Sequence, residues 1–280
     1  MSTTDHDAHV EGVRAFYAQN TEAFLRLGAH GGTAAIHIAL WPEGTERIEQ
    51  AMNVANDLVL SVVSEVSIPV QRILDLGCGV GASLHYLAQA LPDEVQLQGL
   101  TVCPEQARWA REHNPDAARV DVQAGDFHDA ASRMQVGQVA YAIEAFAHAA
   151  SPGRFFEQAA LLIETGGRLV IIDDVCATTD APSKALRTYR DNWMVPSVQP
   201  HAVLDPLAEA VGFRRIHTQD LTPWLKLGRP RDRWLRWSLP LWGWTASWWN
   251  YAKSMKGGDA RQRCLEQGET RFSMVVYERV

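Results

Sequence analysis

Gln71-Arg-Ile-Leu-Asp-Leu-Gly-Cys-Gly-Val-Gly-Ala-Ser-Leu84 is the stretch that decides the fold. Its first apolar residues, Ile73, Leu74 and Leu76, predict a short buried strand, and a helix is expected to begin near Ala82. Three glycines lie between them: Gly77, Gly79 and Gly81. A Cβ there would keep the main chain from closing on a ligand, and the first N–H groups of the helix are free to bind one. The stretch therefore predicts a nucleotide-binding loop, and a tight turn without a ligand is the alternative.

The spacing of these glycines, Asp-x-Gly-x-Gly-x-Gly from Asp75, distinguishes the loop from other nucleotide-binding loops. It differs from the dinucleotide fingerprint Gly-x-Gly-x-x-Gly and lacks the Lys-Ser/Thr of a P-loop. It resembles motif I of the class I methyltransferases that depend on S-adenosylmethionine (SAM). In that family the glycines lie under the methionine part of SAM, so the resemblance implies that Asp75 faces the cationic sulfonium and ammonium groups.

Composition excludes several classes of partner. The chain has 280 residues and a net charge of −7, which argues against nucleic acid because phosphate backbones select clustered basic surfaces. The four cysteines show no Cys-x-x-Cys spacing, so we expect neither a zinc site nor disulfides. The first residues are polar, and no run approaches ~18 apolar residues. The sequence predicts a soluble, cytoplasmic protein that binds a small molecule.

A second motif follows the next predicted strand, Val95–Val102. A ribose-binding acid is usual at the end of this strand, but Thr101 stands there. Gly99-Leu-Thr-Val-Cys-Pro-Glu-Gln-Ala107 resembles the Gly-Ile-Thr-Leu-Ser-Pro-x-Gln-Ala sequence of tocopherol C-methyltransferase-like enzymes. This resemblance implies that Thr101 and Gln106 help to hold SAM. An ordinary strand end, with Pro104 in the first turn of a helix, is the alternative.

A third motif, Gly-Asp-Phe, ends the strand predicted over Val120–His128. The family resemblance implies that Asp126 meets the adenine amino group and that Phe127 packs on the ring. Gly-Asp is also common in plain turns, so the order of the three motifs favours the SAM site more than this motif alone.

The fourth predicted strand begins at Val136 and ends at Glu144, with His148 shortly after it. Ligands lie beyond the carboxyl ends of strands in open α/β sheets, so both side chains should face the cleft near the methyl donor. Tyr141-Ala-Ile-Glu-Ala145, followed by His148-Ala149, resembles a segment of sterol C-methyltransferases, which methylate an isoprenoid double bond. We predict that Glu144 and His148 are the catalytic residues.

The N-terminal region is predicted to cap this core. Residues 10–27 have helical periodicity, and the family resemblance implies that Tyr17 closes over SAM, with simple packing as an equal alternative. The apolar, glycine-punctuated segment 28–42 follows. It is predicted to line a substrate pocket with His37 and Trp41, unless these residues only pack.

Two further segments are predicted to form lids. In residues 176–200, Arg187, Tyr189 and Trp193 can share one helical face and contact the substrate; a solvated surface helix is the alternative. Residues 221–262 contain seven of the ten tryptophans, from Trp224 to Trp249. This second lid packs on the core, lines an apolar substrate pocket that includes Trp224, or lies at a membrane surface.

The predicted fold class is α/β: a Rossmann-like, seven-stranded class I methyltransferase sheet with an N-terminal helical cap and lid insertions. The strand order comes from the resemblance. The expected parts are the cap (1–66), the SAM-binding core (67–175), the first lid (176–200) and the C-terminal part of the core (201–280), which carries the second lid (221–262).

The predicted function is methyl transfer from SAM to a hydrophobic small molecule, helped by alignment and by exclusion of water. C-methylation of an isoprenoid alkene is preferred, because aromatic faces stabilise a carbocation and Glu144 or His148 can remove its proton. A prenyl diphosphate would call on arginines such as Arg187 and on Mg²⁺. The alternatives are an O- or N-methyltransferase of specialised metabolism and a SAM-binding cyclase that transfers no methyl group.

Overall fold

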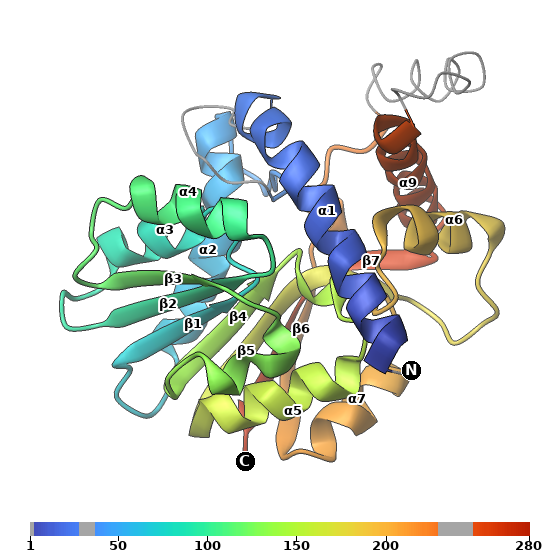
Figure 1. The fold of residues 1–280 in the computed structure, drawn as a ribbon. Coiled ribbons are helices and arrows are strands. Elements are labelled where there is room, and N and C mark those ends of the chain that lie inside the picture. The colour runs from blue at the N-terminus through green and yellow to red at the C-terminus, as the bar shows by residue number, and fades with distance from the viewer. Residues whose placement is uncertain (1–2, 28–36, 229–248) are drawn as a thin grey trace.

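A seven-stranded sheet forms the centre of the computed structural model, which describes residues 3–27, 37–228 and 249–280 (Figure 1). The strands are β1 (Arg72–Leu76), β2 (Gln96–Thr101), β3 (Val120–Ala124), β4 (Gly137–Ile143), β5 (Ile163–Cys176), β6 (Phe213–Asp220) and β7 (Thr270–Arg279). Their order is β3-β2-β1-β4-β5-β7-β6, and β7 alone runs antiparallel to its neighbours. The order reverses between β1 and β4, where open α/β sheets bind ligands.

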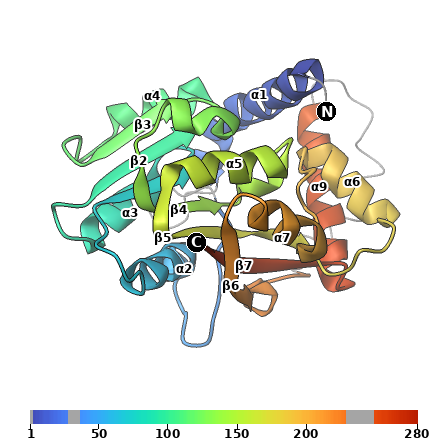
Figure 2. The same cartoon turned by 90° about the horizontal axis from the view of Figure 1, so that it is seen from below.

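Helices cover both faces of the sheet and its carboxyl edge. They are α1 (Thr3–Leu27), α2 (Ile48–Ser64), α3 (Ala82–Ala90), α4 (Pro104–Glu112), α5 (Pro152–Leu162), α6 (Lys184–Trp193), α7 (His201–Glu209) and α9 (Trp249–Glu266), with short 3₁₀ turns η2 (Phe127–Ser132), η3 (Phe146–His148) and η4 (Thr222–Trp224). α5 and α7 cover one face, and α2, α3 and α4 lie on the other (Figures 1 and 2). α1 crosses the molecule near the carboxyl ends of the central strands.

Two apolar cores hold these layers together. Successive residues of a strand point to opposite faces, so Ile73 and Val139 join the core under α2 and α3. Leu74 and Ala140 join the core under α5 and α7. Because both faces are covered, β1 buries Ile73, Leu74 and Leu76 on its two sides, as the sequence indicated.

Some element boundaries differ from those expected. β3 ends at Ala124 rather than at His128, because the Asp126 side chain accepts the His128 N–H and starts η2 instead. β5 begins at Ile163, directly after α5, and so includes the two glycines at 166–167. Residues 229–248 of the tryptophan-rich lid lie outside the described residues, and α9 begins within the lid, at Trp249.

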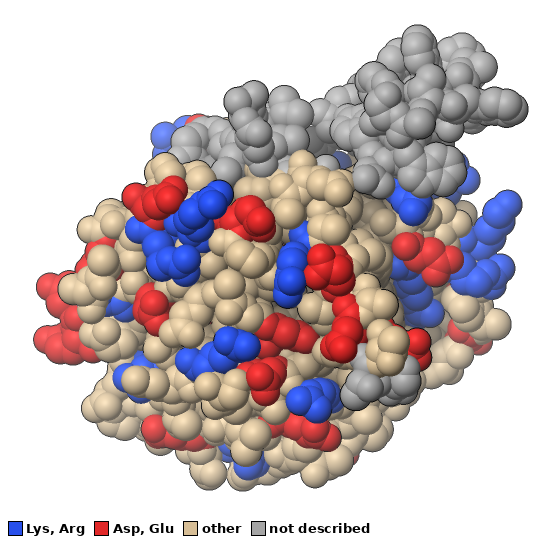
Figure 3. Space-filling view, in the orientation of Figure 1, with Lys and Arg blue, Asp and Glu red and all other residues tan. Residues whose placement is uncertain are grey.

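Charge is mixed on the face that carries α1 and α4: lysines and arginines alternate with acidic residues there (Figure 3). None of the described helices is both long enough and apolar enough to cross a membrane. The division into cap, core and lids remains a prediction.

Candidate active site

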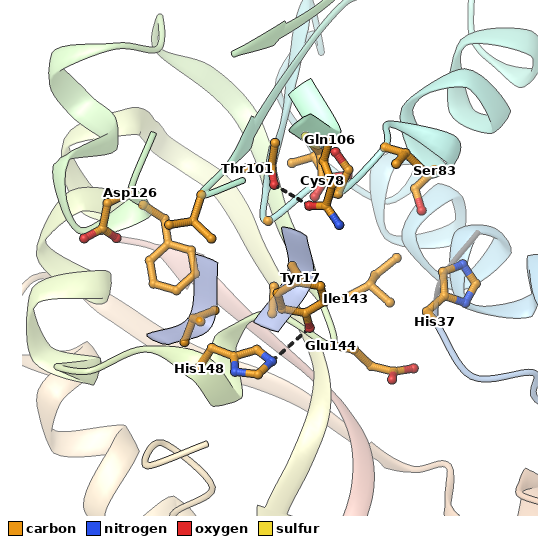
Figure 4. Close-up of a pocket in the computed structure, with 18 of the residues that line it drawn as sticks. Tyr17, His37, Cys78, Ser83, Thr101, Gln106, Asp126, Ile143, Glu144 and His148 are labelled. Atoms are coloured by element: carbon orange, nitrogen blue, oxygen red, sulfur yellow. Dashed lines mark hydrogen bonds between the residues drawn. The ribbon is translucent and has the colours of Figure 1, made fainter. Parts of the chain in front are cut away.

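A cavity opens at the carboxyl ends of β1, β2 and β4, under α1 (Figure 4). The predicted site residues that line it are Tyr17, His37, Asp75, Gly77, Gly79, Thr101, Gln106, Asp126, Phe127, Glu144 and His148. Those that do not line it are Trp41, Gly81, Arg187, Tyr189, Trp193 and Trp224. The cavity thus gathers residues from motifs that are spread over 130 positions of the chain.

The glycine turn after β1 forms the floor of the cavity. The N–H groups of Gly77 and Cys78 both donate to the Leu100 carbonyl oxygen, at 2.9 and 3.0 Å, and tie the turn to β2. Gly77 has a φ of +122°, and a Cβ on it would lie 2.3 Å from the Ala145 Cβ. Gly81 caps the start of α3 with a φ of +81°. Glycine is therefore required at position 77 both for conformation and for space.

Asp75 lies at the end of β1 and is only 3% exposed. Burial raises the pKa of its carboxyl group to about 8, against the lowering effect of the Tyr141 hydroxyl. A cation bound beside it would favour the charged form and reverse this shift. Asp75 is thus suited to a positively charged ligand.

A buried chain of hydrogen bonds joins the second motif to α1. Thr101 Oγ1 donates to Gln106 Oε1 at 2.8 Å, and Gln106 Nε2 donates to Thr21 Oγ1 at 3.1 Å. Thr21 in turn donates to the Tyr17 carbonyl oxygen at 2.6 Å. The helix over the cavity is therefore attached to the end of β2 by buried side chains.

Asp126 lies between two imidazoles. Its oxygens are 2.8 Å from His6 Nε2 and 2.8 Å from His128 Nδ1. Burial alone would raise its pKa, but the hydrogen bonds from His128 and His6 lower it to about 2. The spacing of the three groups would suit a metal ion. However, His128 Nε2 accepts the Ser151 N–H, so its Nδ1 carries a proton, which it donates to Asp126.

Glu144 ends β4 with an unusual backbone conformation, a φ of +49°. One carboxylate oxygen accepts the Ile38 N–H at 2.6 Å. Burial raises the pKa of Glu144 to about 7, although the positive charge of Arg261 opposes the rise. A non-glycine residue in this region carries strain, which here aims an acidic side chain into the cavity.

His148 lies on η3, and both of its ring nitrogens have partners. Nδ1 is 3.1 Å from the Met194 carbonyl oxygen, and Nε2 is 3.0 Å from the Tyr17 hydroxyl (Figure 4). Burial lowers the pKa of His148 to about 4. The imidazole is therefore neutral at neutral pH.

The predicted substrate residues divide into two groups. His37 lines the cavity, and its Nε2 is buried without a partner among the described residues. Trp41 and Trp224 instead meet each other outside the cavity. The backbone N–H of Trp41 donates to the Trp224 carbonyl oxygen at 2.7 Å, and Lys226 lies over the Trp41 ring.

Two of the three residues expected from the first lid, Tyr189 and Trp193, pack against α9. The Tyr189 hydroxyl donates to Asp174 at 2.6 Å, and Asp174 also pairs with Arg261. Trp193 Nε1 donates to the Ser254 carbonyl oxygen, and Arg187 is exposed. The three residues were expected to share one helical face, but α6 directs Tyr189 and Trp193 at α9 rather than into the cavity and leaves Arg187 on its exposed side.

Sequence reasoning missed His9, Val10 and Val13 on α1, and His128 on η2, all of which line the cavity. The apolar spacing of α1 was the available signal for Val13. No local pattern pointed to His9, because its partner His148 lies 139 residues away; the position of His128, two residues after Asp126, was the available signal for that residue.

The sheet order, the glycine turn and the charged cavity beneath α1 define a class I SAM-dependent methyltransferase. Family comparison agrees: the mycolic acid cyclopropane synthetase family matches residues 5–222, and the chain belongs to this family. SAM is accordingly its cofactor. The predictions of fold class and of enzyme class are confirmed.

Two relatives illustrate the range of chemistry around this chain. An O-methyltransferase of Aspergillus sclerotiorum is 28% identical over 215 residues, which are 75% of this chain and 78% of that protein. The 24-methylenesterol C-methyltransferase 2 of Arabidopsis thaliana is 27% identical over 177 residues, which are 58% of this chain and 48% of that protein. The second match confirms the resemblance to sterol C-methyltransferases.

Solved structures with the same fold include the [4+2]-cyclase SpnF, with a TM-score of 0.73 at 20% identity over 96% of each chain. Geranyl diphosphate C-methyltransferase from Streptomyces coelicolor, solved with Mg²⁺, geranyl diphosphate and S-adenosyl-L-homocysteine, has a TM-score of 0.68 at 15% identity and covers 97% of this chain and 98% of its own. These likenesses show the fold.

Proposed function

We propose that this methyltransferase transfers the SAM methyl group to a carbon atom of a hydrophobic, uncharged acceptor, an isoprenoid double bond. In this proposal Asp75 and the glycine turn hold the methionine part of SAM. Thr101 and Gln106 hold its ribose side, and Asp126 and Phe127 hold the adenine. The methyl group then points toward Glu144 and His148. The sterol C-methyltransferase relatives support this choice.

The observation that carries the proposal is the low basicity of His148, whose pKa is about 4. A phenol has a pKa near 10, so moving its proton to such an imidazole would cost roughly 8 kcal/mol. A carbocation formed when an alkene attacks the methyl group is far more acidic and loses its proton even to a weak base. The site therefore suits a reaction in which the proton leaves after methyl transfer.

The described lining of the cavity also favours an uncharged acceptor. Val10, Val13 and Ile143 contribute apolar surface, and no lysine or arginine is among the lining residues that the structure describes. A diphosphate needs such cations. Neither a diphosphate nor Mg²⁺ is therefore part of the proposal.

The second candidate is O-methylation, which the fungal O-methyltransferase relatives favour. His148 would then remove the proton of a hydroxyl group as the methyl group is transferred. The low pKa of His148 opposes this role, so we place it second. A cyclase without methyl transfer is the third candidate, favoured by the likeness to SpnF.

The test is a panel of isoprenoid alcohols, triterpenes, sterols and phenols incubated with trideuteromethyl-SAM and analysed by mass spectrometry. We expect a product with the label on carbon and an equal amount of S-adenosylhomocysteine. Label on oxygen would replace the proposal with the second candidate. A converted acceptor without S-adenosylhomocysteine would replace it with the third.

A further inference from the structure

The Tyr17 hydroxyl group contacts Nε2 of His148, the ring nitrogen that the Met194 carbonyl oxygen does not occupy. The hydroxyl oxygen lies 3.0 Å from Nε2, and the two rings meet edge to face with centroids 5.5 Å apart (Figure 4). The other ring nitrogen, Nδ1, is occupied by the Met194 carbonyl oxygen. No ring nitrogen of His148 is thus left for a proton that comes directly from an acceptor.

The direction of this hydrogen bond follows from the Met194 contact. A carbonyl oxygen can only accept, so Nδ1 carries the hydrogen and Nε2 presents a lone pair. The Tyr17 hydroxyl must therefore donate to Nε2. Met194 caps the end of α6 with a φ of +53°, and this fixed turn points its carbonyl group at His148.

Tyr17 reaches His148 because α1 is docked over the cavity. His9 Nε2 donates to the His148 carbonyl oxygen at 2.9 Å, His6 meets Asp126 at 2.8 Å, and Thr21 meets Gln106 at 3.1 Å. These contacts are spread over about four turns of the helix and join it to His148 and to residues proposed to hold SAM. The Tyr17–His148 bond thus forms together with the cover over the cofactor.

We propose that Tyr17 is a catalytic residue that relays the released proton to His148. The C–H bond next to the carbocation breaks, and its electron pair forms the new double bond. The proton binds the Tyr17 oxygen while the original Tyr17 proton moves to His148 Nε2, which becomes an imidazolium. This inference rests on the proposed function, because it needs a proton that leaves after methyl transfer.

The environment of Tyr17 agrees with a neutral donor. Burial raises the pKa of its hydroxyl group, and the nearby Glu144 and Asp173 carboxyl groups raise it further. The phenol therefore stays protonated at neutral pH and does not act as a phenolate. A concerted relay needs no phenolate, because one O–H bond forms as the other breaks.

Tyr17→Phe tests the relay, with Tyr86→Phe as the matched control. Tyr86 donates to Asp57 at 2.6 Å outside the cavity, so its variant loses a hydroxyl group without touching the site. The first measurement needs no acceptor: ¹⁵N NMR of His148 in the protein bound to S-adenosylhomocysteine. We expect the Nδ1–H tautomer, with an Nε2 signal that shifts in Tyr17→Phe and not in Tyr86→Phe. A proton on Nε2 would overturn the relay.

The second measurement uses the acceptor that the labelled panel identifies. Loss of an acid–base group lowers rates by roughly 10²-fold or more, so kcat of Tyr17→Phe should fall about 100-fold while its dissociation constant for SAM changes little. Products in which water or a neighbouring carbon traps the cation should increase. Weakened SAM binding with unchanged kcat would instead make Tyr17 a clamp on the cofactor and overturn the relay.

Failure of the proposed function and failure of the Tyr17 relay can be told apart. Label on oxygen in the panel ends the proposed function, whatever Tyr17 does. Label on carbon with a Tyr17→Phe variant that has wild-type kcat and product ratio keeps the proposed function and ends the relay.

Discussion

At the scale of single residues, the buried carboxyl group of Asp75 is the feature with the clearest consequence. With a pKa of about 8 it is mostly protonated at pH 7, and a cationic ligand would lower that pKa. We predict that SAM binding at pH 7 releases up to one proton from the protein. Calorimetry in two buffers with different ionisation enthalpies measures this release.

Asp75→Asn is the control for this prediction. It should abolish the proton release and weaken SAM binding by about 10- to 100-fold, since hydrogen bonds to charged groups contribute roughly 1.5–3 kcal/mol. Equal affinities for the variant and the wild type would show that Asp75 does not meet the cation.

Gly77 offers a second test at this scale, and Gly44 serves as the control position. Both have a positive φ, but a Cβ on Gly44 meets nothing within 4 Å, whereas one on Gly77 lies 2.3 Å from Ala145. Gly44→Ala should cost about 1 kcal/mol of unfolding free energy through backbone strain alone. Gly77→Ala should cost roughly 3–5 kcal/mol and abolish SAM binding. Denaturant unfolding compares the two, and similar losses would contradict the close approach.

At the scale of elements, the spacing of residues along the sequence predicted many of the strands and turns. It did not predict which distant residues come into contact. The strands and the glycine turn follow from periodicity and from the order of neighbouring residues, whereas the SAM-binding roles of the three motifs were implied by the family resemblance. His6 and His9 could not be found this way, because their partners Asp126 and His148 are 120 and 139 residues away. Periodicity also put Tyr189 and Trp193 on one face of α6 but could not tell that this face meets α9.

The docking of α1 over the cavity can be tested with substitutions on α1 that leave the Tyr17 side chain in place. His9→Ala with Thr21→Val removes two of its hydrogen bonds, each contributing about 1 kcal/mol. We expect S-adenosylhomocysteine to dissociate roughly tenfold faster in stopped-flow measurements. Asp7→Ala, on the exposed side of the same helix, is the control and should leave the rate unchanged. Equal rates in both variants would mean that α1 does not retain the cofactor.

At the scale of the whole molecule, buried acids set how stability depends on pH. Burial raises the pKa values of Asp75, Glu144 and Asp173 to about 8, 7 and 8, from about 4 in an unfolded chain. Between about pH 4 and pH 8 the folded protein therefore binds more protons than the unfolded chain, and the free energy of unfolding falls as pH rises through this range.

Four histidines act in the opposite sense at lower pH: burial lowers the pKa values of His37, His85, His148 and His201. The pKa values of His37 and His148 fall to about 4, and all four histidines reduce stability as pH falls below about 6.5. Above that pH only the acids act, and we predict that the unfolding temperature decreases from pH 6.5 to 8.5. Thermal unfolding across this range measures it, and Asp75→Asn should flatten the curve. A rise in unfolding temperature would contradict the prediction.

The helix over the cavity is continuous from Thr3 to Leu27, and it carries residues that line the cavity as well as the hydroxyl group of the proposed relay. A displacement of α1 that uncovers the cavity would also break the Tyr17–His148 contact. We therefore expect proton transfer and cofactor exchange to alternate in each turnover.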